Sequence, residues 1–130
     1  MGKPLRHALG HKGEQLARRY LQNKGFEIIA ANYRAGHGEI DIVASDNKQQ
    51  LLVFAEVKSY YARPLDPPEL RVTKKQQQTI IRAAYSFLDE HREFEDFFVR
   101  YDILIVNFSS YPAEITHYEA AFWQDGAFPV

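Results

Sequence analysis

The sequence predicts an α/β domain in which a mixed central β-sheet is flanked by helices. Two segments carry apolar residues at helical spacing, and several short runs rich in β-branched residues lie between and after them. The order is helix, three strands, helix, strand, strand, which is typical of helices packed on a mixed sheet. At 130 residues and 45% hydrophobic content, the chain suits one core, so we expect a single domain over residues 1–130.

The first helix is expected from about residue 8 to 24, because Leu9, Leu16 and Leu21 recur on one face and Gly25 suits a C-cap. Three strands should follow, at 26–34, 39–45 and 51–58. The glycine-rich turn AGHG separates the first two strands, and a polar turn that starts at Asp46 separates the second and third.

After a loop rich in Tyr and Pro, residues 72–91 predict the second helix, with Thr73 as its N-cap. The strongly apolar run at 98–108 predicts a central strand, and 114–119 predicts a short edge strand. The connection from the third strand through the second helix to the fourth strand suits a parallel crossover.

Composition excludes several kinds of site. The chain has no cysteine, so disulfides and thiolate chemistry are excluded, any metal must bind oxygen or imidazole, and a cytoplasmic protein is expected. No segment has the length or hydrophobicity of a signal or a membrane span, so we expect no membrane partner.

The net charge of −1, from 16 basic and 17 acidic residues, does not itself indicate a polyanion partner. The charge is nevertheless asymmetric: residues 3–24 hold six Lys and Arg against one acid, whereas residues 89–96 hold five acids. A basic helix face also occurs without any binding role, so charge alone decides nothing.

Two pairs of polar side chains carry the candidate chemistry. Successive residues of a strand point to opposite faces, so Glu39 and Asp41 project together, as do Glu56 and Lys58. If the second and third strands form a hairpin with Val43 opposite the phenylalanine of FAEVK, Asp41 also lies opposite Glu56, and Lys58 lies beside Glu39.

Two opposed carboxylates in an apolar sheet repel each other unless a proton or cation intervenes. Mg²⁺ is typically held by one or two carboxylates with waters and substrate phosphate, and a nearby lysine can hold the attacking water or the phosphate. These groups suit phosphodiester hydrolysis. The residues alone leave a second reading open, in which all four side chains form the solvated face of an ordinary hairpin.

GEIDIVA at 38–44 and VFAEVKS at 53–59 resemble the YraN family of small bacterial proteins, which is similar to archaeal Holliday-junction resolvases and to the PD-(D/E)xK, or restriction-endonuclease-like, superfamily. The resemblance extends over most of the chain, including the opening helix, the VTKKQQQ helix, RYDILIV and ITHYEAAF. The chain departs from the superfamily pattern where an isoleucine stands in place of the proline before the aspartate.

This resemblance implies a restriction-endonuclease-like core with Asp41 and Glu56 as metal ligands and Lys58 as the catalytic lysine. It implies that Glu14 completes the acidic cluster as a further catalytic residue and metal ligand. Glu39 belongs to the GEID signature and either contacts the metal or its waters, or pairs with Lys58 or an arginine.

Four further residues are weaker candidates for nucleic-acid contacts. Lys75 and Gln76 match polar positions at the start of the second helix, where a solvated face is nearly as good a reading. Tyr60 and Arg63 follow the lysine and suit stacking against a base or sugar, or a role as loop anchors.

Arg100 and Asp102 share one face of the fourth predicted strand, and we expect them to form a structural ion pair rather than to take part in catalysis. The five histidines show no metal-ligand spacing, and a surface role is the preferred interpretation of His37.

The leading expectation is therefore an endonuclease that uses Mg²⁺ or Mn²⁺ to hydrolyse DNA, including branched or otherwise structured DNA. The alternatives are a non-catalytic nucleic-acid-binding or adaptor module that retains the fold, and a hydrolase of another phosphorylated substrate. A homodimer is expected, because a two-fold symmetric junction suits a two-fold symmetric enzyme.

Overall fold

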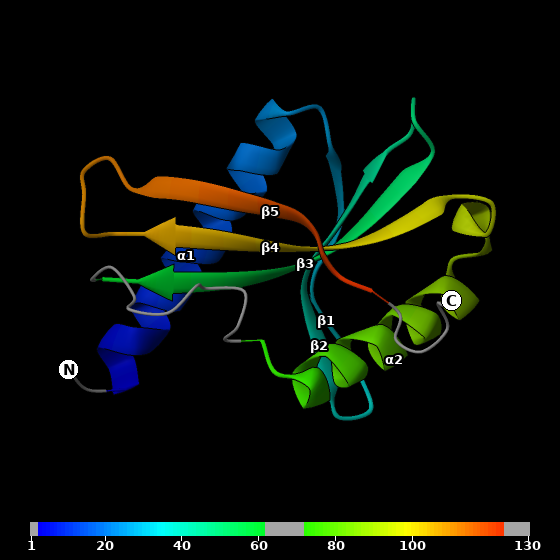
Figure 1. Cartoon of the computed structure of the whole chain (residues 1–130), viewed down its shortest axis with the longest axis horizontal. Coiled ribbons are helices and arrows are strands. Elements are labelled where there is room, and N and C mark those ends of the chain that lie inside the picture. Colours follow the sequence, from blue (N-terminus) through cyan, green and yellow to red (C-terminus); the bar gives the residue numbers. More distant parts are fainter. Residues whose placement is uncertain (1–2, 62–71, 124–130) are drawn as a thin grey trace.

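The computed structural model describes residues 3–61 and 72–123, with side chains from residue 10 onward (Figure 1). The helices and strands follow the predicted order. They are α1 (Lys3–Asn23), β1 (Glu27–Ala35), β2 (Gly38–Asp46), β3 (Leu51–Tyr60), α2 (Lys74–Glu90), the short 3₁₀ helix η2 (Arg92–Phe94), β4 (Phe98–Asn107) and β5 (Glu114–Phe122).

The five strands form one mixed sheet in the order β1-β2-β3-β4-β5. Neighbouring strands are antiparallel except β3 and β4, which are parallel and joined through α2. The predicted parallel crossover, interior β4 and edge strand β5 are therefore confirmed. This arrangement is compatible with a restriction-endonuclease-like fold.

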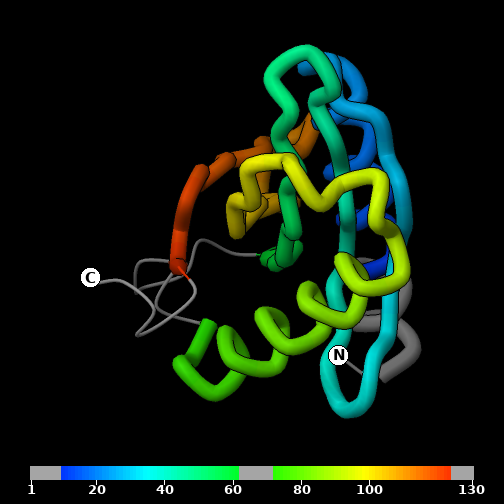
Figure 2. Tube along the Cα trace, turned by 90° about the vertical axis from the view of Figure 1, so that its right-hand side faces the viewer, coloured from blue at the N-terminus to red at the C-terminus, as the bar shows by residue number. Residues whose placement is uncertain are grey.

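The two helices cover opposite faces of the sheet, as Figures 1 and 2 show together. Phe54 and Ile103 point to the α2 side, where they pack with Phe87 of that helix. Their sequence neighbours Ala55 and Leu104 point to the α1 side, into a second cluster that includes residues of α1. Period-2 alternation along central strands thus builds two cores, because both faces of the sheet are buried.

The helix ends mostly follow their sequence signals. Thr73 caps α2: its hydroxyl accepts from the Gln76 amide, and the Gln76 side chain accepts from the Thr73 amide, which completes a capping box. Gly25, just after α1, has φ +97°, as its predicted C-cap role requires. However, α1 begins at Lys3, not near residue 8. Extending a formed helix adds a hydrogen bond for each residue fixed, so it can continue beyond the apolar stripe that predicts it.

The β2–β3 hairpin has the predicted register, with Val43 opposite Phe54. The Asp46 carboxylate accepts from the backbone amides of Lys48 and Gln49, at 3.1 and 3.4 Å, and closes the turn. Neither described helix is both long and apolar enough to span a membrane.

Candidate active site

The acidic site lies where the β2–β3 ladder ends. The last backbone pair on this side of the hairpin is Ile42 with Ala55. Beyond it, the Asp41 carboxylate accepts a hydrogen bond from the Val57 amide at 2.8 Å. The side chain of Asp41 therefore takes the place of a backbone acceptor and ties β2 to the segment of β3 that carries Glu56 and Lys58.

Burial, followed by the charge of the neighbouring Glu56, raises the pKa of Asp41 to about 8. The Val57 hydrogen bond acts in the opposite direction, while the charges of Glu14 and Glu39 add to the increase. At neutral pH, Asp41 without a bound cation is therefore mainly protonated. Four acidic side chains from α1, β2 and β3 thus act on one another electrostatically.

Glu56 has a raised pKa for the same main reason, burial, which Lys58 and a hydrogen bond with Asp41 partly oppose. The Lys58 Nζ lies 3.6 Å from Glu56 Oε2, and their side chains are 24% and 17% exposed. This single ammonium does not offset the buried acidic group, since the pKa values of both Asp41 and Glu56 remain raised.

Glu39 lies at the rim of this group. Its carboxylate pairs with Arg34 Nε of β1 at 3.5 Å, which is one of the two partners expected for it. Its charge still raises the pKa of Asp41 and Glu56. Lys58, which the register placed beside Glu39, instead pairs with Glu56 on its own strand.

Close packing of α1 on β3 brings Glu14 to the site. A Cβ at Gly13 would overlap the Ser59 Oγ and also contact the ring of Phe108. The absence of a side chain at Gly13 therefore lets the helix approach the strand, and Glu14 is the next residue. Ser59 Oγ is itself buried, and it has no hydrogen-bond partner in the described part of the chain.

The donor chemistry of the site fits a hard divalent cation. Among residues 10–61 and 72–123, no three His, Asp or Glu side chains lie close enough to form a ready-made metal cage. Mg²⁺, however, commonly uses one or two carboxylates and keeps several waters. Asp41 and Glu56 supply two such carboxylates, and burial, to which neighbouring acidic charges add, raises the pKa of both.

The weaker sequence candidates are more dispersed. Lys75 is exposed, and Gln76 is committed to the α2 capping box. Tyr60 is half-buried at the end of β3, where its carbonyl accepts from the Phe108 amide at 2.7 Å. Arg63 lies outside the described residues.

The predicted Arg100–Asp102 ion pair is confirmed, with both of its hydrogen bonds at 2.9 Å. Sequence reasoning missed that His117 joins it: Nε2 lies 2.7 Å from the buried Asp102 carboxylate, and Nδ1 lies 3.4 Å from the hydroxyl of Tyr20 on α1. The only sequence signal was a histidine within an edge strand. This network joins α1 to β4 and β5.

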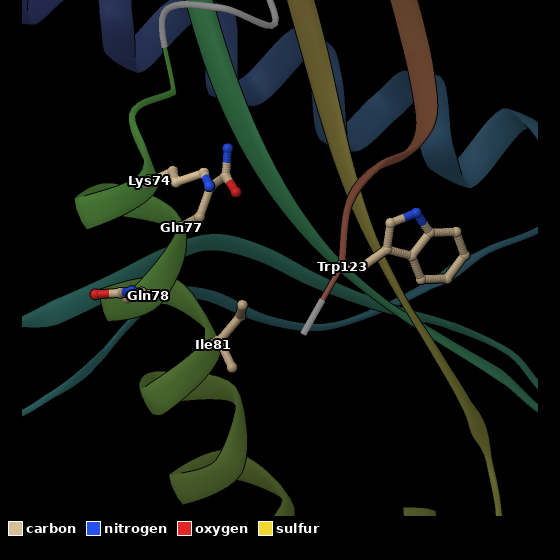
Figure 3. A pocket seen from close by; sticks show the side chains of 5 residues that line it. All are labelled: Lys74, Gln77, Gln78, Ile81 and Trp123. Carbon is tan, nitrogen blue, oxygen red and sulfur yellow. The ribbon is translucent and has the colours of Figure 1, made fainter. Parts of the chain in front are cut away.

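A small hollow of about 110 Å³ separates the start of α2 from the end of β5 (Figure 3). It is lined by Lys74, Gln77, Gln78, Ile81 and Trp123. The Gln77 amide already donates to the Val72 carbonyl at 3.0 Å. Its size suits a few waters rather than a nucleotide, and none of the acidic residues lines it.

The chain matches the model of the uncharacterised protein family UPF0102 over residues 13–106, a range that contains Glu14, Asp41, Glu56 and Lys58. It is 36% identical to a UPF0102 protein of Treponema denticola over 88% of this chain and 95% of the relative. A UPF0102 protein of Geobacter metallireducens is 40% identical over 88% and 92%. Another, from Nitrobacter winogradskyi, is 45% identical over 78% and 86%. The chain therefore belongs to the UPF0102 family, which is the YraN family that its sequence resembles.

Proposed function

We propose that this protein is a Mg²⁺- or Mn²⁺-dependent endonuclease that hydrolyses phosphodiester bonds in DNA. One observation carries the proposal: the partly buried carboxylates of Asp41 and Glu56 influence each other and have raised pKa values, and the adjacent Lys58 forms an ion pair with Glu56. Ionising both carboxylates together is unfavourable in this partly buried site unless a cation binds there.

Asp41 and Glu56 would hold the ion, and the negative charge of Glu14 would add to its attraction. When bound, the ion lowers the pKa of a water and offsets the negative charge that develops at phosphorus. The Val57 amide fixes the direction of the Asp41 carboxylate. Lys58 stands within 3.6 Å of Glu56 and would donate to the attacking water or to a phosphate oxygen.

The proposal extends to branched or otherwise structured DNA and to a homodimer, on the basis of the resemblance to junction resolvases. Two copies related by a two-fold axis would present two acidic sites to a four-way junction. Both statements concern substrate choice and assembly, and either could fail without affecting the hydrolytic chemistry.

The test is cleavage of labelled linear, single-stranded, flap and four-way-junction DNA, with Mg²⁺, with Mn²⁺ and with chelator. Glu56→Gln and Lys58→Met should each abolish metal-dependent cutting while they keep the volume of the side chain. The matched control is Glu93→Gln on η2, which is exposed and should cut like wild type. Cutting that persists in Glu56→Gln would reveal a contaminating nuclease and remove the support for this proposal.

A second candidate function is a nucleic-acid-binding or adaptor module without turnover. The lack of three metal-ligating side chains in close proximity among the described residues favours it, because a pair of carboxylates holds a cation more weakly. DNA binding without cleavage of any DNA form, in either metal, would select this module over the enzyme.

A further inference from the structure

A groove on the outer side of α1 carries positive charge near the acidic site. We call it the α1 groove: an open hollow of about 400 Å³ lined by Gln15, Arg18, Arg19 and Gln22 of α1 and by Ile28 of β1. The four polar residues recur at helical spacing and share one side of the helix. Figure 1 shows the two elements that supply this lining, α1 and β1.

The groove has no acidic lining residue, and its two arginines are not paired with any carboxylate that the structure describes. The next basic residue of the sequence, Lys24, already has partners, because its Nζ lies 3.8 Å from Glu119 Oε2 and 3.4 Å from His117 Nδ1. Each guanidinium has five donors in a planar fork that matches phosphate oxygens, and the glutamine amides add further donors.

The position of the groove relates it to the acidic site. Arg18 follows Glu14 by four residues, about 6 Å along the helix axis. Gly13 of the same helix packs against Ser59, the residue that follows Lys58, so the end of the groove at Gln15 lies within a helical turn of the strand that carries Glu56 and Lys58. From Gln15 to Gln22 the groove runs about 10 Å, which is enough for about three phosphates of one strand of duplex DNA.

We propose that the α1 groove holds the phosphate backbone of DNA and directs the strand toward Asp41 and Glu56. This inference rests on the proposed function and adds to it the surface that binds the substrate. Contacts to the phosphate backbone carry no sequence information, so the groove should contribute equally to binding of any DNA sequence. It also explains how a chain with a net charge of −1 binds a polyanion, since the positive charge is local.

The experiment compares the full-length wild type with Arg18→Gln/Arg19→Gln by fluorescence anisotropy on a labelled duplex and a four-way junction, in chelator, from low to high KCl. The matched control, Lys48→Gln/Arg92→Gln, removes the same charge from exposed positions outside the groove. We expect at least about tenfold weaker binding at low salt for the groove variant. The slope of log affinity against log salt should fall by about two, because each lost phosphate contact removes about 0.9. The control should keep the wild-type slope.

A second measurement separates this inference from the proposed function. Hydrolysis of bis(p-nitrophenyl) phosphate with Mn²⁺ requires the acidic site but is too small to need the groove, so the groove variant should retain wild-type rates. If the groove variant kept the wild-type DNA affinity and salt slope, the inference would be overturned and the nuclease proposal would stand. The same would follow if poly-glutamate displaced DNA as readily as polyphosphate does, because the groove would then bind an acidic protein segment. If the groove variant lost the salt slope but the wild type hydrolysed no phosphodiester, the groove would be supported as the DNA-binding surface and the proposed nuclease activity would be overturned.

Discussion

The backbone amide of Val57 donates to the Asp41 carboxylate at 2.8 Å, and Val57 stands between Glu56 and Lys58 in the chain. This one hydrogen bond orients the acid of β2 relative to the acid and the lysine of β3. It also stabilises the ionised form of Asp41 against burial and the charge of Glu56, both of which favour the protonated form. The site is therefore held in place before a cation binds, but it is electrostatically unfavourable without one.

Asp41→Asn should stabilise the protein in chelator at alkaline pH. Folded Asp41 keeps its proton up to a pKa of about 8, whereas the unfolded residue loses it near its ordinary value of 3.8. Between these values the folded state binds more protons, so wild-type stability falls as pH rises. Asparagine does not ionise and still accepts from Val57. Urea unfolding at pH 8 to 9 should favour Asp41→Asn by about 2 kcal/mol, and the difference should vanish near pH 4.

The control for that series is Asp89→Asn, an exposed position on α2, whose stability should follow wild type at every pH. If the unfolding free energy of Asp41→Asn followed that of wild type at every pH, the pKa of Asp41 would not be raised in the folded protein.

Cation binding at neutral pH should release protons. Because Asp41 is largely protonated at pH 7 and a ligating carboxylate must be ionised, Mg²⁺ or Mn²⁺ should displace nearly one proton for each ion bound. Titration calorimetry in two buffers with different ionisation enthalpies measures this number. The number of protons released for each bound ion should approach zero at pH 9.5 and in the Asp41→Asn variant. An enthalpy that does not depend on the buffer at pH 7 would show that the ion binds elsewhere.

Much of the site was accessible from sequence because strand geometry is periodic. The alternation in FAEVK placed Glu56 and Lys58 on one face, and the turn at Asp46 set the register that pairs Val43 with Phe54. In GEIDIVA the expected alternation is wrong around Asp41, because Ile40 packs on the α2 side and Ile42 on the α1 side. The ladder does not continue past Ile42, however. A period-2 pattern contains no information on where a side chain replaces a backbone acceptor, so the role of the Val57 amide was not predictable.

Contacts between residues far apart in the sequence could not be predicted from strand alternation either. The pair Arg100 and Asp102 was predicted because the two residues are neighbours on one strand. His117 lies 15 positions from Asp102, and the register of β4 with β5 shifts between Tyr101 and Ile103, so local spacing does not bring the two together. Tyr20, which extends the network to α1, is 97 positions from His117.

Asp102→Asn should destabilise the fold at neutral pH by roughly 2–4 kcal/mol, because it removes the charge that Arg100 and His117 surround. Burial alone would raise the pKa of Asp102, but the hydrogen bonds from His117, Arg100 and the Ala120 amide lower it below the ordinary 3.8. A lowered folded pKa contributes stability above the unfolded pKa, and this is lost as pH falls through the folded value.

Thermal unfolding of Asp102→Asn and wild type should therefore differ most above about pH 4 and converge in stronger acid. The Asp89→Asn variant again serves as the control. A pH-independent gap between Asp102→Asn and wild type would indicate that the defect is one of packing, with no contribution from charge.

Gly13→Ala should lower both stability and cleavage, although alanine normally stabilises a helix by about 1 kcal/mol relative to glycine. The added Cβ would overlap the Ser59 Oγ and push α1 from β3, at a cost of about 1–3 kcal/mol, and it would shift the adjacent Glu14 away from Asp41.

Ser59→Ala alone should be neutral or stabilising, because it removes a buried hydroxyl without a described partner. The double variant should recover part of the loss, because it removes the overlap with Oγ but leaves the Cβ at position 59 in a tight contact, 3.2 Å from the new atom. Urea unfolding and cleavage of one DNA form measure both effects. The control is Gly10→Ala, which should be more stable than wild type because no atom lies within 4 Å of the added Cβ. If Gly13→Ala were also more stable than wild type, α1 would not need its close approach to β3.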